Sequence, residues 1–99
     1  MAPSEFDAFC RFAFGFLQER GIRHLVVGGL AVVVVGEPRM TADADAIVFV
    51  SMGEAESLIH EAVAAGFELR EEIERERLVR TGTLRFRRGP FRIDLITAS

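Results

Sequence analysis

The chain has no lysine, a single cysteine and no long hydrophobic run. All twelve basic residues are arginine, which excludes a lysine nucleophile and a Walker-type phosphate-binding lysine. Cys10 has no partner for an internal disulfide, and its place on the apolar side of a helical pattern favours core packing. No apolar run approaches the about 18 residues of a membrane span, and the N-terminus lacks the basic region of a secretory signal. We therefore expect a cytoplasmic protein that does not contact a membrane.

The 99 residues suffice for one domain with a modest core, which we assign to residues 1–99. The net charge of −3 conceals an asymmetry. Residues 1–76 hold six arginines and fourteen acids, whereas residues 77–99 hold six arginines and only one acid, Asp94. A basic patch in the second part predicts either an anionic substrate or an arginine-coated strand that neutralises the preceding glutamates. The patch consists of Arg85, Arg87, Arg88 and Arg92.

Residues 4–20 have the pattern of a helix, with Ser4 as its N-cap and Gly21 directly after its end. The apolar positions cover roughly 200° of the helix circumference, which is wider than contact with one sheet requires. We therefore expect a second subunit, or a further region of the protein, to cover part of this surface. A homodimer through helix 4–20 is the arrangement that we favour. The side chains concerned are Phe6, Phe9, Phe12, Phe14 and Phe16.

The next segment predicts a strand at residues 23–27 that leads into the pair Gly28-Gly29. Residues 30–35 include four consecutive valines, which favour a strand by propensity. Glycines on both sides weaken a continuous strand, so we prefer a turn followed by a short buried helix. A second strand is expected at residues 44–50, because this run is rich in β-branched and aromatic residues.

A second helix is expected to begin at the capping box of Ser51 and Glu54 and to end at Gly66. Its apolar stripe consists of Ala55, Leu58, Ile59, Ala62 and Val63.

Residues 67–69 are expected to begin another strand. The charged stretch 70–77 is compatible with a loop, a strand or a helical turn. Two further strands are predicted at about 78–87 and 91–97, with a turn through Gly89 and Pro90 between them.

Two carboxylates stand two residues apart, at Asp43 and Asp45, where the strand of residues 44–50 begins. Residues i and i+2 of a strand point to the same face, so both carboxylates project together. Two like charges so close raise each other's pKa unless a cation sits between them. A divalent metal is the usual reason for such a pair, and hard carboxylate oxygens suit Mg²⁺ or Mn²⁺.

A third acid, Asp94, falls in the middle of the strand at 91–97, where aspartate is disfavoured by propensity and by burial. A salt bridge to Arg92 or Arg39 would explain it. Alternatively, if this strand lies beside the strand at 44–50, three carboxylates converge. Three carboxylates that hold two divalent ions are the apparatus for phosphoryl or nucleotidyl transfer.

The Gly28-Gly29 pair fits the same chemistry, because a glycine turn before a helix lets backbone N–H groups approach a phosphate. By itself this signal is weak. A dinucleotide-binding interpretation fails, because no G-x-G-x-x-G follows the strand.

Taken together, the order Val27-Gly28-Gly29, then Asp43-Ala44-Asp45, then Asp94 on a later strand resembles the polymerase-β-like nucleotidyltransferase superfamily. The fuller string looks like its abortive-infection branch, the AbiEii type of bacterial type IV toxin–antitoxin systems. That string runs from Gly28-Gly29-Leu30-Ala31 through Gly36-Glu37-Pro38-Arg39 to Thr41, Asp43 and Asp45, and the resemblance covers residues 24–96.

The resemblance implies an α/β (α+β) protein with the nucleotidyltransferase fold, a mixed sheet of about four to five strands flanked by helices. It implies Mg²⁺ or Mn²⁺ as cofactor and a nucleoside triphosphate such as ATP or GTP as substrate. By position, Asp43, Asp45 and Asp94 would be the catalytic metal ligands. Gly28 and Gly29 would line the triphosphate, and Arg39 and Thr41 would support the site.

The chain departs from the family pattern in two respects. Ala44 replaces the larger aliphatic residue that is common between the two acids. The family's C-terminal helical region, which binds the base or the acceptor, is also absent from residues 1–99. We therefore expect a shortened chain, a minimal domain completed by a partner, or a degenerate member.

The leading functional hypothesis is transfer of a nucleoside monophosphate to an acceptor hydroxyl, with RNA or tRNA as a candidate acceptor. The alternative is a non-catalytic nucleotide-binding or interaction module that works with an antitoxin or another partner protein. A third reading is a small α/β domain whose acids cap and pair with arginines.

Overall fold

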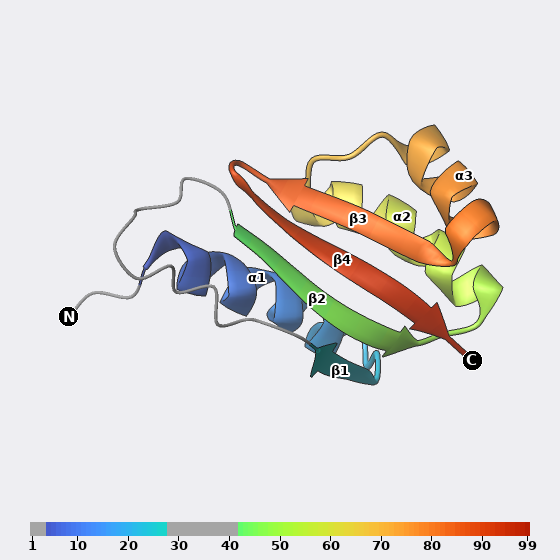
Figure 1. The fold of residues 1–99 in the computed structure, drawn as a ribbon, viewed down its shortest axis with the longest axis horizontal. Coiled ribbons are helices and arrows are strands. Elements are labelled where there is room, and N and C mark those ends of the chain that lie inside the picture. Colours follow the sequence, from blue (N-terminus) through green and yellow to red (C-terminus); the bar gives the residue numbers. More distant parts are fainter. Residues whose placement is uncertain (1–3, 28–41) are drawn as a thin grey trace.

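The structure is a computed structural model that describes residues 4–27 and 42–99 (Figure 1). The predictions for Gly28, Gly29, Arg39 and Thr41, and for the helix at 30–35, fall outside these residues. The elements follow one another as α1 (Glu5–Glu19), β1 (His24–Val27), β2 (Ala42–Phe49), α2 (Met52–Ala65), α3 (Glu71–Thr81), β3 (Thr83–Arg88) and β4 (Phe91–Ala98).

The strands form one mixed sheet in the order β1-β2-β4-β3. β1 pairs with β2 antiparallel, β2 with β4 parallel, and β3 with β4 antiparallel. The last strand of the chain therefore lies inside the sheet, between β2 and β3. This arrangement confirms the α+β class and the mixed sheet with helices that the sequence predicted.

Helices α1 and α2 lie on one face of the sheet, and α3 lies next to the edge strand β3 (Figure 1). Alternate residues of β2, β3 and β4 are buried against the helices, as period-two alternation predicts for a sheet with one covered face. On the strands these buried residues are Ala44, Ala46, Val48, Leu84, Phe86, Ile93 and Leu95. Their helical counterparts include Phe9, Phe16, Leu17, Leu58, Ile59 and Leu78. No helix within residues 4–27 and 42–99 is long and apolar enough to cross a membrane.

Helix α1 begins where predicted, because the Ser4 hydroxyl accepts a hydrogen bond from the Asp7 N–H at 3.1 Å. The expectation of a second subunit rested on its phenylalanines. Phe9 and Phe16 are buried within this chain, and the other three are partly buried against the same core. Aromatic residues from other elements cover them. The ring centroids of Phe12 and Phe67 are 4.8 Å apart, and those of Phe6 and Phe91 5.8 Å apart. Contacts within this chain therefore account for much of the wide apolar arc, and the homodimer through α1 stays a prediction.

Helix α2 also has the predicted ends. Ser51 and Glu54 form the reciprocal capping box, and Gly66 adopts a left-handed conformation with φ 109° after the last turn.

The segment after α2 differs from the prediction. Residues 67–69 form no strand but a single bridge, in which Glu68 pairs with Arg87. The predicted strand at 78–87 begins only at Thr83, because α3 extends from Glu71 to Thr81. Only two of its residues, Glu74 and Leu78, are buried. The sequence of this helix therefore lacks the apolar stripe from which a helix is usually predicted. Ion pairs one turn apart stabilise it instead, such as Arg75 with Glu71 at 3.1 Å.

Glu74 joins α3 to the outer edge of β3. Among residues 4–27 and 42–99, Glu74 is the one charged residue that is buried. One carboxylate oxygen accepts the backbone N–H of Arg85 at 2.8 Å and the Arg77 Nε–H at 3.2 Å. Further along, the Glu68 bridge pairs with the same edge of β3. These contacts satisfy edge groups that would otherwise be open to a foreign strand.

We predict that Glu74→Ala lowers the free energy of unfolding by about 1.5–3 kcal/mol, because it leaves the Arg85 N–H and the Arg77 guanidinium without their acceptor. Glu76→Ala is the matched control on the same helix. Glu76 pairs with Arg80 at 3.5 Å on the surface, and such a pair contributes about 0–1 kcal/mol. Urea unfolding followed by circular dichroism measures both changes. Equal losses in the two variants would show that Glu74 does not anchor the edge.

Candidate active site

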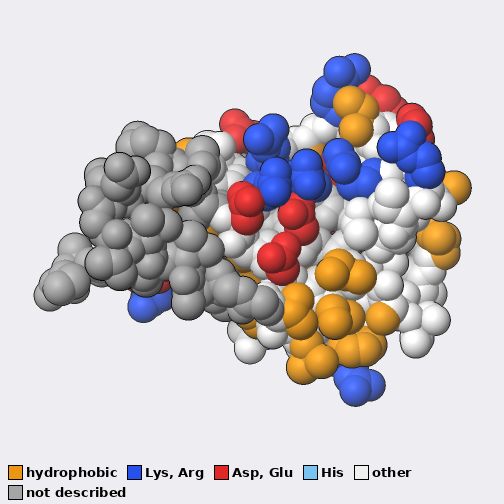
Figure 2. Space-filling model, viewed as in Figure 1, with side chains coloured by type: hydrophobic (Ala, Val, Ile, Leu, Met, Phe, Trp, Pro, Cys, Tyr) orange, Lys and Arg blue, Asp and Glu red, His pale blue; other side chains and the backbone are white. Residues whose placement is uncertain are grey.

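The three acids predicted to act together share one face of the sheet. Since Ala44, Ala46 and Val48 point to the helices, Asp43, Asp45, Ile47 and Phe49 of β2 point the other way. We call this side the outer face. It also carries Arg85 and Arg87 of β3, Arg92, Asp94 and Ile96 of β4, and Leu25 of β1. Basic, acidic and hydrophobic side chains form three successive bands there (Figure 2).

β2 and β4 are neighbours in the sheet and run parallel. The strand that carries Asp94 therefore lies beside the strand that carries Asp43 and Asp45. The register of this pairing places Asp45 directly beside Asp94, and Asp43 directly beside Arg92. On the far side of β4, Arg85 is the partner of Asp94. Asp45, Asp94 and Arg85 therefore form one row across three strands, with the two carboxylates on adjacent strands.

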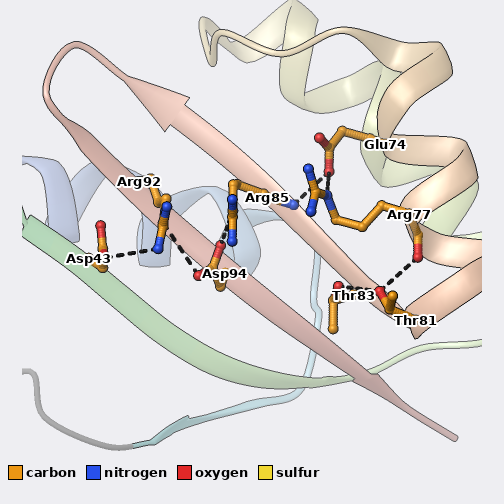
Figure 3. A network of polar contacts seen from close by, with 8 residues as sticks. All are labelled: Asp43, Glu74, Arg77, Thr81, Thr83, Arg85, Arg92 and Asp94. Atoms are coloured by element: carbon orange, nitrogen blue, oxygen red, sulfur yellow. Dashed lines mark hydrogen bonds and ion pairs between the residues drawn. The ribbon is translucent and has the colours of Figure 1, made fainter.

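Two arginines hold two of the three carboxylates (Figure 3). Arg85 Nε donates to Asp94 Oδ1 at 2.9 Å. Arg92 Nη2 donates to Asp43 Oδ2 at 3.0 Å, and Arg92 Nε lies 3.4 Å from Asp94 Oδ2. The sequence suggested an Arg92–Asp94 salt bridge as one explanation for Asp94, and this contact is present. The contact of Arg92 with Asp43 was not foreseen, because it depends on the register of two strands.

These contacts continue from the outer face to α3. Arg85 binds Asp94 through its side chain and Glu74 through its backbone N–H, and Glu74 in turn pairs with Arg77 (Figure 3). The position of Asp94 is thus fixed through β3 by a helix that lies beyond the sheet edge.

Asp45 stands apart in this network. It is half-buried, and it forms no ion pair with any of residues 4–27 or 42–99. Its cross-strand neighbour Asp94 carries the same charge, and like charges directly opposite one another destabilise a sheet. Among the described residues, therefore, arginines compensate the charge of Asp94 but not that of Asp45.

The donor chemistry of the three aspartates suits a hard divalent cation, as the sequence predicted. Within residues 4–27 and 42–99, however, no group of three or more acidic, histidine or cysteine side chains is arranged to hold a metal ion. Arg92 contacts both Asp43 and Asp94, so these carboxylates would have to exchange the guanidinium for a metal. The metal role of Asp43, Asp45 and Asp94 stays a prediction.

An exposed apolar band lies beside the acids, and the sequence analysis did not single it out. Leu25, Ile47 and Ile96 are in register on β1, β2 and β4, and Phe49 follows on β2. Leu25 is 56% exposed, Ile96 43% and Phe49 39%. The signal was present in the sequence, because after Asp45 both alternating faces of β2 become apolar.

Cys10 takes no part in the outer face, since it lies on α1 and packs partly against the core. Burial raises the pKa of its thiol, and the nearby Asp7 carboxylate raises it further. A thiol with a raised pKa is a poor nucleophile at neutral pH, which agrees with the predicted packing role.

Comparison with known proteins gives no match to a protein-family model or to a curated protein sequence.

Two substitutions in the acidic row are predicted to change stability in opposite directions. Asp45→Asn should raise the free energy of unfolding by about 0.2–1 kcal/mol, because it removes a like charge opposite Asp94. Asp94→Asn should lower it by about 1–3 kcal/mol, because Arg85 loses a charged acceptor and Arg92 loses one of its two ion-pair partners. Thermal and urea unfolding in EDTA measure both effects, and the gain in Asp45→Asn should shrink at high salt. A loss of stability in both variants would contradict the repulsion between Asp45 and Asp94.

Proposed function

We propose that this protein is a metal-dependent nucleotidyltransferase of the polymerase-β-like superfamily, similar to its abortive-infection branch. The observation that carries the proposal is the in-register placement of Asp45 beside Asp94 on parallel neighbouring strands. Asp43 lies two residues earlier on the same face. The three carboxylates thus lie on one face of the sheet, on two adjacent strands, although Asp94 is distant from the other two in the sequence.

In the proposed reaction, the acceptor hydroxyl oxygen forms a bond to the α-phosphorus of a nucleoside triphosphate, and the hydroxyl proton passes to solvent water. The bond from that phosphorus to the bridging oxygen breaks, and pyrophosphate leaves with the bonding electron pair. Asp43, Asp45 and Asp94 would hold Mg²⁺ or Mn²⁺, which when bound favours ionisation of the acceptor hydroxyl and stabilises the charge of the leaving group. Gly28, Gly29, Arg39 and Thr41, outside the described residues, are proposed to contact or support the triphosphate.

RNA or tRNA is the candidate acceptor that we propose to test first, in a cytoplasmic toxin–antitoxin setting, with a protein, an antibiotic or another small molecule as alternatives. This part of the proposal rests on the resemblance in sequence alone.

A second candidate function is a non-catalytic nucleotide-binding or interaction module of a toxin–antitoxin pair. The contacts of Arg85 and Arg92 favour it, because they already neutralise Asp94 and Asp43 without a metal. The exposed apolar band of Leu25, Phe49 and Ile96 is also compatible with a protein partner.

Nucleotide binding should depend on a divalent metal. We expect calorimetric titration with ATP or GTP to give a measurable affinity in Mg²⁺ and a much weaker one in EDTA, because free triphosphate and the acidic row repel each other. Binding that is equally tight in both buffers would exclude a metal-bridged site and support a purely arginine-based nucleotide site.

Asp45→Asn is predicted to abolish nucleotide transfer while the fold remains intact, because no other described side chain can replace the lost metal ligand. Each α-labelled nucleoside triphosphate is incubated with Mg²⁺ and total cellular RNA or lysate, and transfer is followed on a gel. Glu56→Gln is the matched control, since Glu56 is exposed on α2, on the opposite side of the sheet. Near-wild-type transfer by Asp45→Asn would show that Asp45 is no metal ligand. Absence of transfer by the wild type, with nucleotide binding retained, would favour the non-catalytic module.

A further inference from the structure

Arg92 occupies the position between Asp43 and Asp94 in which a cation is expected. Its guanidinium contacts both acids, with distances of 3.0 Å to Asp43 Oδ2 and 3.4 Å to Asp94 Oδ2. The arginine side chain is only 28% exposed, so most of its hydration is already lost. No other described side chain forms an ion pair with two of the three predicted metal ligands.

The fit of Arg92 to this position is incomplete. Its Nε is buried and has no hydrogen-bond partner in the described part of the chain, since the contact with Asp94 is an ion pair without hydrogen-bond geometry. A buried donor without an acceptor costs free energy. Arg85, by contrast, makes a direct hydrogen bond of 2.9 Å to the same carboxylate. Of the two guanidinium groups, Arg92 therefore makes the weaker contact with Asp94.

We propose that Arg92 is an internal cation that competes with the divalent metal for Asp43 and Asp94. The metal can then bind only when Arg92 leaves the two carboxylates. In the metal-free protein, Asp43 and Asp94 stay paired with Arg92. The inference rests on the proposed function, because the metal in question is that of the transferase site. It adds a regulatory role for a residue that the resemblance does not assign.

Electrostatics makes the two cations mutually exclusive. β4 places Arg92 opposite Arg87, and Arg85 lies one row away on the same strand pair. A divalent ion added beside a retained Arg92 would bring a further positive charge to a face that already carries three guanidinium groups. Release of Arg92 removes this repulsion, and it frees the Asp43 and Asp94 oxygens for the metal.

The test measures the binding of Mn²⁺ alone, by electron paramagnetic resonance of free Mn²⁺, to the wild type and to Arg92→Met and Arg87→Met. Methionine keeps part of the apolar stem and removes the charge. Arg87→Met is the matched control for the loss of one positive charge on the same face, because Arg87 is exposed and forms no ion pair with residues 4–27 or 42–99. Arg92→Met is expected to bind Mn²⁺ about tenfold more tightly than Arg87→Met. Equal affinities of the two variants would overturn the proposal.

A second measurement uses the wild type alone and so does not depend on the folding of Arg92→Met. The Arg92 Nε–H resonance, assigned by its loss in Arg92→Lys, should shift on titration with Mg²⁺, whereas the Arg87 resonance should move little. An unshifted Arg92 signal at saturating Mg²⁺ would overturn the competition but not the transferase. A tenfold gain in Arg92→Met without any nucleotide transfer would support the competition and count against the transferase. Absence of metal binding in all proteins would overturn both.

Discussion

The parallel pairing of β2 with β4 is the interaction on which the outer face depends. One register sets Asp45 beside Asp94 and Asp43 beside Arg92, while the same pairing buries Ala44, Ile93 and their neighbours beneath the helices. A slip of one residue would turn the acids into the core and the apolar side chains to the outside. Burial of the apolar side chains on the core face fixes the strand register. That register in turn sets the positions of the charged side chains on the opposite face.

Local signals account for the parts of the fold that could be predicted from the sequence. The ends of α1 and α2 are specified by contacts within a few residues. These local signals are the N-cap Ser4, the capping box at Ser51 and the glycine that follows each of the two helices. Helix α3 escaped prediction because charged pairs and Glu74, rather than an apolar stripe, stabilise it. The strand expected at 67–69 was wrong for a related reason, since Glu68 pairs with Arg87 at a single position only.

The candidate site was predictable in its acids but not in their partners. The spacing of Asp43 and Asp45 and the mid-strand place of Asp94 can be seen in the sequence alone. The bridge from Arg92 to Asp43 joins residues 49 positions apart, and its existence follows only from strand order and register. The contacts of the apolar arc of α1 were unpredictable for the same reason. Phe67 and Phe91, which pack against its phenylalanines, are distant from α1 in the sequence.

The position of β4 has a consequence for how this molecule folds. The final strand of residues 1–99 forms a hairpin with β3 and also pairs with β2, so the sheet is complete only when this hairpin has joined β2. Contacts between such distant residues form slowly, because closure of the intervening loop costs entropy before any contact compensates for it. Until that step, the acids of β2 have neither Asp94 beside them nor Arg92 to neutralise them. The pairing that completes the centre of the sheet is therefore also the one that brings the charges of β2 and β4 together.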